Sequence, residues 1–254
     1  MKKLMFAAAL ALVPLAAAQA VPADVATAVS APGRPADAVA LDEVRKPVEV
    51  LRWLGLERGD RVLDFLTANG YYAEIMARAV GPTGHVTGWN TPSFMRSEAI
   101  LNSLNGIRQR SPNTAFYATP NDAFALPEQT YDFIMLHMVY HDMYWQSPRF
   151  TLARIDPATI TAALFRATKP GGTVAVIDHV AAPGRDTRAE VDATHRILPA
   201  TVRADFERAG FEFVGETDLL RNLADDRSKS VFDPSIRGRT DRFVYRFRRP
   251  LRAR

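Results

Sequence analysis

The sequence predicts an α/β protein built on one doubly wound sheet of seven strands, with the last strand antiparallel. Short apolar stretches with strand character alternate with amphipathic helical stretches along residues 41–250. Strands that are separated by helices pair in parallel through right-handed crossovers. The last two predicted strands, 211–217 and 241–248, are instead joined by a polar loop without a strong helical pattern, which favours an antiparallel final strand. No internal repeat and no linker interrupts this region, so we expect one domain.

Apolar runs bounded by Gly, Pro and polar turn residues predict the strands. The run at 131–138 is apolar almost throughout, which indicates burial on both faces of the sheet. In chain order, the predicted strands are 61–65, 85–89, 114–118, 131–138, 173–178, 211–217 and 241–248.

Apolar residues at helical spacing predict the crossover helices. Pro47 must lie near the first turn of the first helix or kink that helix, whereas Pro157 suits the first position of its own helix. Gly81 and Gly210 end two of the helices. In chain order, the predicted helices are 41–56, 71–80, 97–110, 157–168 and 200–209.

The composition narrows the class of protein. With 254 residues, 47% hydrophobic residues and 24% charged residues, the chain is not a disordered, collagenous or multi-span membrane protein. It contains no Cys, which excludes disulfides, a thiolate nucleophile and Cys-ligated metal centres. The net charge of +4 conceals an asymmetry, because eight Arg and one Asp lie between residues 237 and 254 and the body before them is acidic. Without interleaved aromatic residues, this basic end does not indicate nucleic-acid binding.

Residues 1–20 have the pattern of a secretory signal peptide. Two lysines precede an apolar run that is too short to span a bilayer comfortably, and Ala18-Gln19-Ala20 fits a signal-peptidase site. We therefore expect cleavage after Ala20, a periplasmic or secreted protein, and no integral membrane segment in the mature chain. Residues 21–40 are expected to form a flexible leader, residues 41–250 the folded domain, and residues 251–254 a basic tail.

Several motifs resemble those of class I S-adenosylmethionine-dependent methyltransferases. A strand that ends in Asp64 runs through a turn to Gly70, and a second strand ends at Asn90. The strand at 131–138 is followed by a Lys-Pro-Gly-Gly turn and a further strand. More narrowly, the chain is similar to the exported bacterial "predicted methyltransferase" family in the stretches Asn69-Gly70-Tyr71-Tyr72, Tyr140-His141-Asp142, Ile177-Asp178-His179, Thr194-His195-Arg196, Leu220-Arg221-Asn222 and Gly238-Arg239-Thr240-Asp241-Arg242-Phe243.

This resemblance runs from about residue 41 to residue 250 and implies S-adenosyl-L-methionine as cofactor, methyl transfer to a small-molecule acceptor, and a monomer or homodimer. In a doubly wound sheet, ligands bind outside the carboxyl ends of the strands at the switch point, here between strands 61–65 and 131–138. Asp122 matches the residue that contacts the adenine amino group, and a helix cap or Asx-turn is its alternative role. The cofactor-binding residues that the resemblance implies are Asp64, Phe65, Gly70, Tyr71, Asn90, Asp122 and Ala123.

Two features depart from the superfamily pattern. The cofactor turn of the superfamily is Asp-x-Gly-x-Gly-x-Gly, whereas this chain has Leu66 and Ala68 at the first two glycine positions. Their side chains narrow the slot for the methionine part of the cofactor. Asn90 stands where a carboxylate usually accepts both ribose hydroxyl hydrogens, and an amide offers only one acceptor oxygen. A non-catalytic protein that binds another ligand in the same pocket is therefore the alternative function.

Histidines and carboxylates gather after the fourth and fifth predicted strands. His141 and Asp142 follow one strand, Asp178 and His179 end the other, and neighbouring strands lie on the order of 5 Å apart. His195 lies on the next segment and can return over them. Such a set suits general-base removal of an acceptor proton, a divalent metal in a hydrolase, or a structural hydrogen-bond network. We expect His141, Asp142 and His179 to be catalytic and no metal to be bound.

Overall fold

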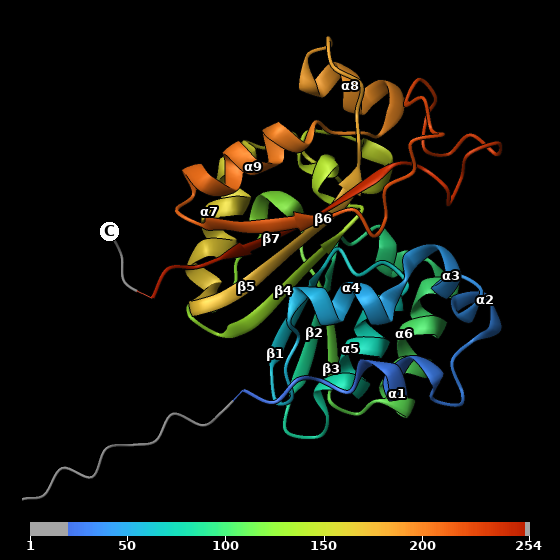
Figure 1. The fold of residues 1–254 in the computed structure, drawn as a ribbon, viewed down its shortest axis with the longest axis vertical. Coiled ribbons are helices and arrows are strands. Elements are labelled where there is room, and N and C mark those ends of the chain that lie inside the picture. Colours follow the sequence, from blue (N-terminus) through green and yellow to red (C-terminus); the bar gives the residue numbers. More distant parts are fainter. Residues whose placement is uncertain (1–19, 252–254) are drawn as a thin grey trace, which may run out of the picture.

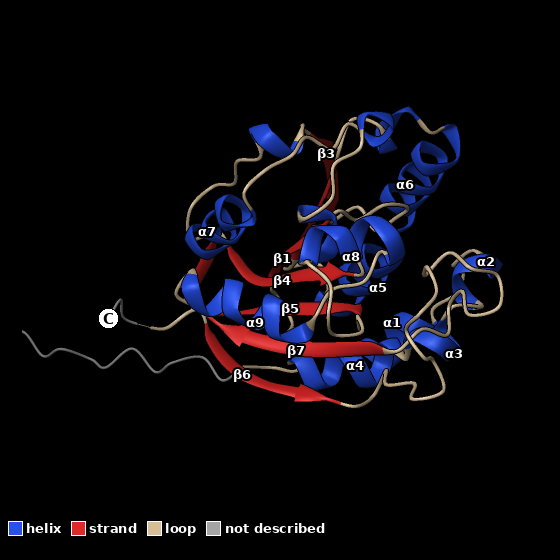
Figure 2. Cartoon of the chain, turned by 90° about the horizontal axis from the view of Figure 1, so that it is seen from above, coloured by secondary structure: helices blue, strands red, loops and turns tan. Residues whose placement is uncertain are grey.

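The computed structural model describes residues 20–251, and its centre is one sheet with the strand order β3-β2-β1-β4-β5-β7-β6. Figure 2 shows the strands stacked in this order. β1, β2, β3, β4 and β5 pair in parallel, whereas β7 runs antiparallel to both β5 and β6. The predicted fold class is therefore confirmed. The strands are β1 Arg61–Phe65, β2 His85–Asn90, β3 Thr114–Ala118, β4 Tyr131–His137, β5 Thr168–His179, β6 Glu212–Thr217 and β7 Arg242–Arg248.

Helices cover both faces of the sheet (Figure 1). One hydrophobic cluster joins α1, α4 and α5 to one face, and a second joins α7 and α9 to the other. The two clusters take alternate residues of each central strand, such as Phe133 and Ile134 of β4. The α-helices are α1 Val25–Ser30, α2 Ala36–Val39, α3 Asp42–Arg45, α4 Pro47–Leu54, α5 Tyr71–Val80, α6 Glu98–Arg110, α7 Pro157–Ala167, α8 Thr187–Thr194 and α9 Pro199–Arg208. Short 3₁₀ helices are η1 Phe94–Arg96, η2 Asn121–Ala123, η3 Tyr140–Met143 and η4 Pro148–Phe150.

Residues 21–40, expected as a flexible leader, instead contain α1 and α2 and contribute to the core. Val25 and Ala28 of α1 are buried against α4 and α5. The backbone of this segment is also paired, because the Ala23 N–H donates to Leu56 O at 3.0 Å and the Arg58 N–H donates to Val21 O at 2.8 Å. The sequence underestimates this segment because it is rich in Ala and Pro without a clear helical pattern, and only contacts with residues far along the chain bury its apolar side chains.

The first predicted helix is two helices, and one further helix was not expected. Lys46 adopts a left-handed conformation (φ +44°) between α3 and α4, which places Pro47 at the first position of a new helix. The additional helix α8 begins after Asp186, whose side chain accepts hydrogen bonds from two backbone N–H groups of the first turn. The other helices and strands lie close to their predicted ranges, although β5 already begins at Thr168.

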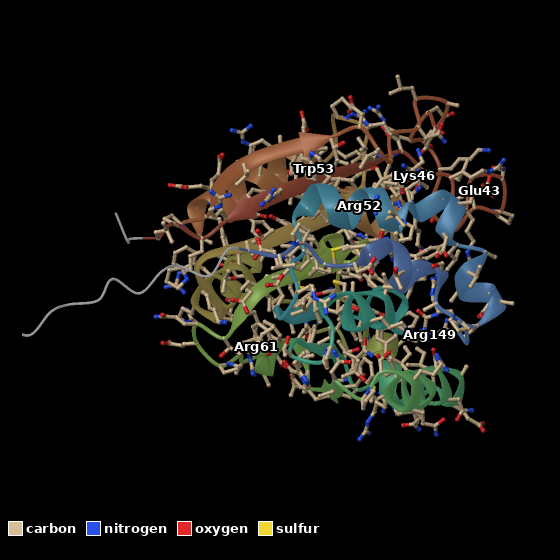
Figure 3. The ribbon with its side chains drawn as sticks, turned by 60° about the horizontal axis from the view of Figure 1, so that its bottom comes forward. Glu43, Lys46, Arg52, Trp53, Arg61 and Arg149 are labelled. Carbon is tan, nitrogen blue, oxygen red and sulfur yellow. The ribbon has the colours of Figure 1, made fainter. Side chains whose placement is uncertain are left out.

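Residues 1–19 and 252–254 lie outside the described part, and with them all but the last residue of the expected signal peptide and most of the expected basic tail. No helix within residues 20–251 combines the length and the apolarity needed to cross a membrane. In Figure 3, Arg61 at the start of β1 lies at the opposite end of the molecule from Arg149 and Glu43. The segments around Arg149 and Glu43 adjoin the carboxyl ends of the parallel strands, where we expect ligands to bind.

Candidate active site

A cavity of about 240 Å³ opens between the carboxyl ends of β1 and β4. Its lining combines the turn after β1, the end of α3, the start of α5 and the segment after β4. This is the switch point of the sheet, because the connections from β1 and β4 leave in opposite directions along the strand order. The lining residues are Arg45, Asp64, Phe65, Leu66, Thr67, Ala68, Asn69, Tyr71, Tyr72, Phe94, His137, Met138, Val139 and Asp142.

The turn after β1 keeps a glycine-like backbone at positions that have lost their glycines. Leu66 and Ala68 have φ values of +51° and +49°, and Gly70 has a φ of +84°. A left-handed conformation costs an L-residue with a Cβ roughly 1–2 kcal/mol. At Gly70 the absence of a side chain is also a packing requirement, because a Cβ there would overlap Ile107 of α6. The turn therefore adopts a backbone conformation that glycine favours, although Leu66 and Ala68 both carry side chains and this conformation costs them free energy.

Asn90 holds this turn in place. Its Oδ1 accepts a hydrogen bond from the Ala68 N–H at 2.9 Å, and its Nδ2 donates to the Ala68 carbonyl at 3.1 Å. The Thr67 N–H donates to Trp89 O at 2.9 Å, and the Ser103 hydroxyl donates to Asn69 O at 2.8 Å. The structure therefore turns the Asn90 amide onto the backbone of the turn, which differs from the ribose contact that the resemblance implies.

Charged and polar groups face the cavity from β1 and α3. Asp64 is buried and accepts a hydrogen bond from the Thr67 hydroxyl at 2.5 Å, and burial raises the pKa of its carboxyl to about 7. The Arg45 guanidinium lies 4.3 Å from the centre of the Tyr71 ring and makes no hydrogen bond within the described part of the chain. The Tyr71 hydroxyl itself donates to Asp42 at 2.7 Å, so its ring is fixed beneath Arg45.

After Arg45, His137 is the second residue of the cavity with a side-chain polar atom that makes no hydrogen bond among the described residues. It is the last residue of β4. Its Nε2 is buried and has no hydrogen-bond partner among the described residues. Burial holds the pKa of this imidazole well below its usual value, and the nearby Arg45 and Arg242 guanidinium groups lower it further. A buried imidazole nitrogen without a partner is costly inside a protein, so this atom is available for a hydrogen bond at the cavity.

The segment after β4 and the end of β5 together form a row of three charged side chains. Pairing of β4 with β5 confirms the neighbourhood on which this part of the site depends. His141 Nδ1 lies 2.8 Å from Asp178 Oδ1, and the backbone N–H of His141 donates to Asp178 Oδ2 at 2.9 Å. On its other side, His141 Nε2 lies 3.4 Å from Asp142 Oδ1. Asp142 is the member of this Asp178–His141–Asp142 row that lines the cavity.

The electrostatics of the row assign different protonation states to its members. Burial alone would lower the pKa of His141, but the Asp178 and Asp142 carboxylates raise it to about 9. Burial raises the pKa of Asp142 to about 6, because the His141 cation offsets only part of the desolvation. At neutral pH His141 is thus a cation held between two carboxylates. Because His141 already holds its proton, the ionised group of this row that faces the cavity at neutral pH is the Asp142 carboxylate.

Two further histidines pack against His141. The His179 ring centre lies 5.9 Å from that of His141, and its Nδ1 lies 2.7 Å from the Thr240 hydroxyl. The His195 ring centre lies 5.6 Å from that of His141. Burial lowers the pKa of His179 to about 3 and that of His195 to about 4. Both rings are neutral at physiological pH, and no group of three or more His, Asp or Glu side chains within residues 20–251 is arranged to hold a metal ion.

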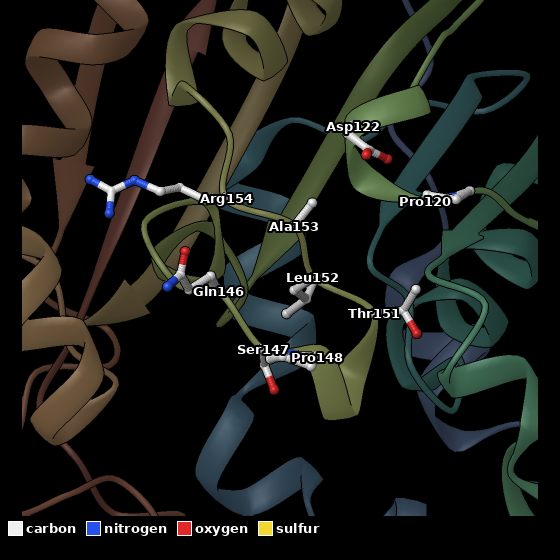
Figure 4. A pocket seen from close by; sticks show the side chains of 9 residues that line it. All are labelled: Pro120, Asp122, Gln146, Ser147, Pro148, Thr151, Leu152, Ala153 and Arg154. Carbon is white, nitrogen blue, oxygen red and sulfur yellow. The ribbon is translucent and has the colours of Figure 1, made fainter.

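A second cavity of about 600 Å³ lies beyond the ends of β3 and η3 (Figure 4). Asp122 of η2 and Arg154 stand on opposite sides of it. Asp122 is exposed, and its carboxylate makes no hydrogen bond within the described part of the chain, so it serves neither as a helix cap nor in an Asx-turn.

The structure divides the residues chosen from the sequence into two places. Asp64, Phe65, Tyr71 and Asp142 line the first cavity, with Asn90 and Gly70 behind its turn and His141 and His179 behind Asp142. Asp122 and Ala123 belong to η2 at the second cavity. Arg45 and His137 are not among the site residues chosen from the sequence. Arg45 carries no local signal, and His137 resembles any residue of a buried strand.

Comparisons with known proteins agree with this architecture, although no family model matches the chain. Over 131 residues the chain is 31% identical to a 2-phytyl-1,4-naphtoquinone methyltransferase of Synechococcus elongatus, covering 50% of this chain and 49% of that protein. The chain thus spans about half the length of the curated relatives it matches.

Solved structures extend the likeness to most of the fold. An S-adenosylmethionine-dependent methyltransferase from Aquifex aeolicus superposes with a TM-score of 0.58 at 19% identity, covering 82% of this chain and 92% of that one. The [4+2]-cyclase SpnF superposes with a TM-score of 0.55 at 16% identity, covering 85% of this chain and 80% of that one. The fold therefore does not by itself determine the reaction. By the order of its seven strands and by these structural neighbours, the chain has the class I S-adenosylmethionine-dependent methyltransferase fold.

Proposed function

We propose that this protein binds S-adenosyl-L-methionine in the cavity between β1 and β4 and transfers its methyl group to a small-molecule acceptor. The observation that carries the proposal is the turn after β1, which keeps left-handed backbone at Leu66 and Ala68 although neither is glycine. Strained backbone persists where function requires its shape. The 31% identity to a naphthoquinone methyltransferase over half of this chain also supports methyl transfer.

The residues of the cavity fit the methionine part of the cofactor. Among the described residues the Arg45 guanidinium contacts the Tyr71 ring but makes no hydrogen bond or ion pair, so it suits a carboxylate, and the N-terminus of α5 also favours an anion. The cavity of about 240 Å³ falls below the roughly 300 Å³ at which ligand sites usually begin. We therefore assign the methionine part to this cavity and the adenine end to the direction of Asp122 at the second cavity.

The chemistry divides between the cofactor and the chain. When bound, S-adenosyl-L-methionine supplies an electrophilic methyl group on a sulfonium. Asp142 accepts the proton of the acceptor, and its pKa of about 6 suits a base that works at neutral pH. His141 orients the Asp142 carboxylate and is itself fixed by two contacts to Asp178. His141 is thus a positioning residue, and His179 supports it from behind.

Replacement of Arg45 tests the cofactor assignment. Arg45→Met keeps the length of the side chain but removes the charge, and we expect the affinity for S-adenosylhomocysteine to fall about 10-fold or more in calorimetric titration. Arg52→Met on α4 is the matched control, because Arg52 is exposed and lies outside the cavity. Equal affinities of the two variants would contradict the assignment of the carboxylate to Arg45.

We also propose that the protein is exported, with cleavage after Ala20. The signal-like pattern of residues 1–20 supports this. Cleavage there leaves the hydrogen bond between the Arg58 N–H and Val21 O in place, so the mature chain keeps its N-terminal packing. Intact-mass measurement of protein from the periplasmic fraction should give a chain that begins at Val21. A full-length chain confined to the cytoplasm would contradict this proposal.

A further inference from the structure

A continuous series of aromatic rings begins at the first cavity, which Phe94 lines, and leads away from it; we call the series the aromatic rim: Phe94, Phe150, Trp145, His195 and Phe232. Neighbouring rings in this series have centre-to-centre distances of 6.3, 5.7, 4.6 and 4.9 Å. The rings come from five places in the chain: η1, η4, the residues after η3, the residue after α8, and the loop between β6 and β7. Figure 1 shows α8 and that loop at the same end of the molecule.

The aromatic rim is continuous with the proposed site. Phe94 lines the cavity together with Asp142. At its middle, His195 contacts the His141 ring, whose Nε2 lies 3.4 Å from Asp142. A molecule lying against the rings would therefore have one edge beside the Asp142 carboxylate.

Most of the aromatic rim lies outside the hydrophobic core, and only Phe94 packs against one of the two clusters. Trp145, Phe150 and Phe232 belong to neither hydrophobic cluster, and Phe232 is 57% exposed. The segment that carries Phe232 is nevertheless held firmly, since the Val231 N–H donates to Thr194 O at 3.0 Å. Deeper in the same loop, Asp225 pairs at 2.8 Å with the fully buried Arg196, which lies between α8 and α9. Exposed aromatic surface on an anchored loop is typical of a binding element.

We propose that the aromatic rim binds the methyl acceptor, and that this acceptor is a planar aromatic compound with an ionisable hydroxyl group directed at Asp142. The rings offer flat π faces and edges that favour aromatic partners over saturated ones. The neutral His195 adds a polar atom beside the ring of the acceptor without adding a competing charge. The inference rests on the proposed function, because it names the substrate class of that same site.

The reaction that this arrangement supports is O-methylation. The acceptor hydroxyl gives its proton to the Asp142 carboxylate, and the oxygen lone pair forms a bond to the methyl carbon. The electrons of the broken carbon–sulfur bond return to sulfur, which leaves S-adenosylhomocysteine and a methyl aryl ether. The proton on Asp142 then passes to water.

A pair of probes that differ only in planarity tests the proposal. We expect calorimetric titration to show binding of 2-naphthol in the presence of S-adenosylhomocysteine, and at least 10-fold weaker binding of the saturated analogue decahydro-2-naphthol. Trp145→Leu and Phe232→Ala should each weaken 2-naphthol binding roughly 3- to 10-fold. Neither variant should change the affinity for S-adenosylhomocysteine. Leu223→Ala is the matched control, because Leu223 is exposed in the same loop and outside the rim.

The outcomes separate this inference from the proposed function. If S-adenosylhomocysteine binds but 2-naphthol does not, or if the saturated analogue binds equally well, the acceptor class is wrong while the methyltransferase assignment stands. If 2-naphthol binds with the expected dependence on Phe232 but S-adenosylhomocysteine does not bind, the methyltransferase assignment fails, and with it the role of the rim in methyl transfer. Phe232 is exposed, so its replacement should leave folding intact and keep the test decisive even where Trp145→Leu is unstable.

Discussion

The two sides of the cavity are built on opposite principles. On the β1 side, the turn from Leu66 to Gly70 presents backbone to the ligand, and side chains such as Asn90 hold that backbone in shape. On the β4 side, Met138 is also left-handed, with a φ of +57°, but the polar groups are side chains, namely the buried charges of the Asp178–His141–Asp142 row. The first side fits a constant cofactor, whereas the second is suited to moving a proton.

This difference shows how each side tolerates change in sequence. The turn on the β1 side holds a left-handed backbone at Leu66 and Ala68 without glycine, and hydrogen bonds from Asn90 and Ser103 enforce its conformation. A row of buried charges has no such tolerance, because removing one member leaves another charge buried without its partner. Substitutions on the two sides should therefore have different consequences for stability, for ligand binding and for turnover.

The largest effect is expected at Asp142. Asp142→Asn removes the proposed base while keeping the shape of the side chain, so methyl transfer to 2-naphthol should fall at least about 100-fold. The affinity for S-adenosylhomocysteine should change less than about 3-fold. Radiolabelled methyl transfer measures the first quantity and calorimetry the second. Asp218→Asn, at an exposed residue of the β6–β7 loop, is the control. An active Asp142→Asn variant would place the base elsewhere.

Gly70 provides the corresponding test of the β1 side. Gly70→Ala adds a Cβ that overlaps Ile107 between two packed helices and also strains a residue with a φ of +84°. Gly238 has a similar φ of +79° but no atom within 4 Å of such a Cβ. Gly70→Ala should lower the free energy of unfolding by about 1–3 kcal/mol more than Gly238→Ala, as measured by urea denaturation. Equal losses would show that only backbone strain matters at Gly70.

The charge of His141 on the β4 side should make the free energy of unfolding depend on pH. Because the pKa of His141 rises from its ordinary value near 6.5 to about 9 on folding, its charge stabilises the fold below pH 6.5. That contribution is lost as the pH rises through 9. We expect the free energy of unfolding to fall by about 2 kcal/mol between pH 7 and pH 9.5 in the wild type. In His141→Gln this slope should be largely absent, and an unchanged slope would mean that His141 is not the group responsible.

The smallest effect is a stabilising one. Ala68→Gly relieves the left-handed strain without removing a packed side chain, so we expect a gain of about 0.5–1 kcal/mol in the free energy of unfolding. Ala77→Gly, in the interior of α5, should instead cost roughly 1 kcal/mol. Thermal or urea unfolding measures both changes. A loss at Ala68 would argue that the turn is not strained.

Much of this molecule could be predicted from its sequence, and the failures have physical causes. The seven strands and the antiparallel β7 follow from alternation and from the missing helix before β7. The burial of Val25 was not predictable in this way, because it depends on contacts with α4 and α5 rather than on a local pattern. The same holds for Lys46, whose left-handed conformation splits one predicted helix into two.

The candidate site, too, could be predicted from the sequence only in part. The sequence placed His141 and Asp178 together through the expected neighbourhood of β4 and β5, which the strand pairing confirms. It could not assign the direction of the proton, because the protonation of His141 depends on having a carboxylate on each side and on burial. Nor could it identify Arg45, whose significance is that its guanidinium makes no hydrogen bond or ion pair within the described region.

The central claim is that the cavity between β1 and β4 binds S-adenosyl-L-methionine, and calorimetric titration of the mature protein tests it most directly. We predict heat consistent with one site per chain for S-adenosylmethionine and S-adenosylhomocysteine, with dissociation constants below about 1 mM. Arg45→Met should weaken both. The absence of heat and of any thermal shift at millimolar concentrations of both ligands would contradict the account, and would favour a binding protein for another ligand on the same fold.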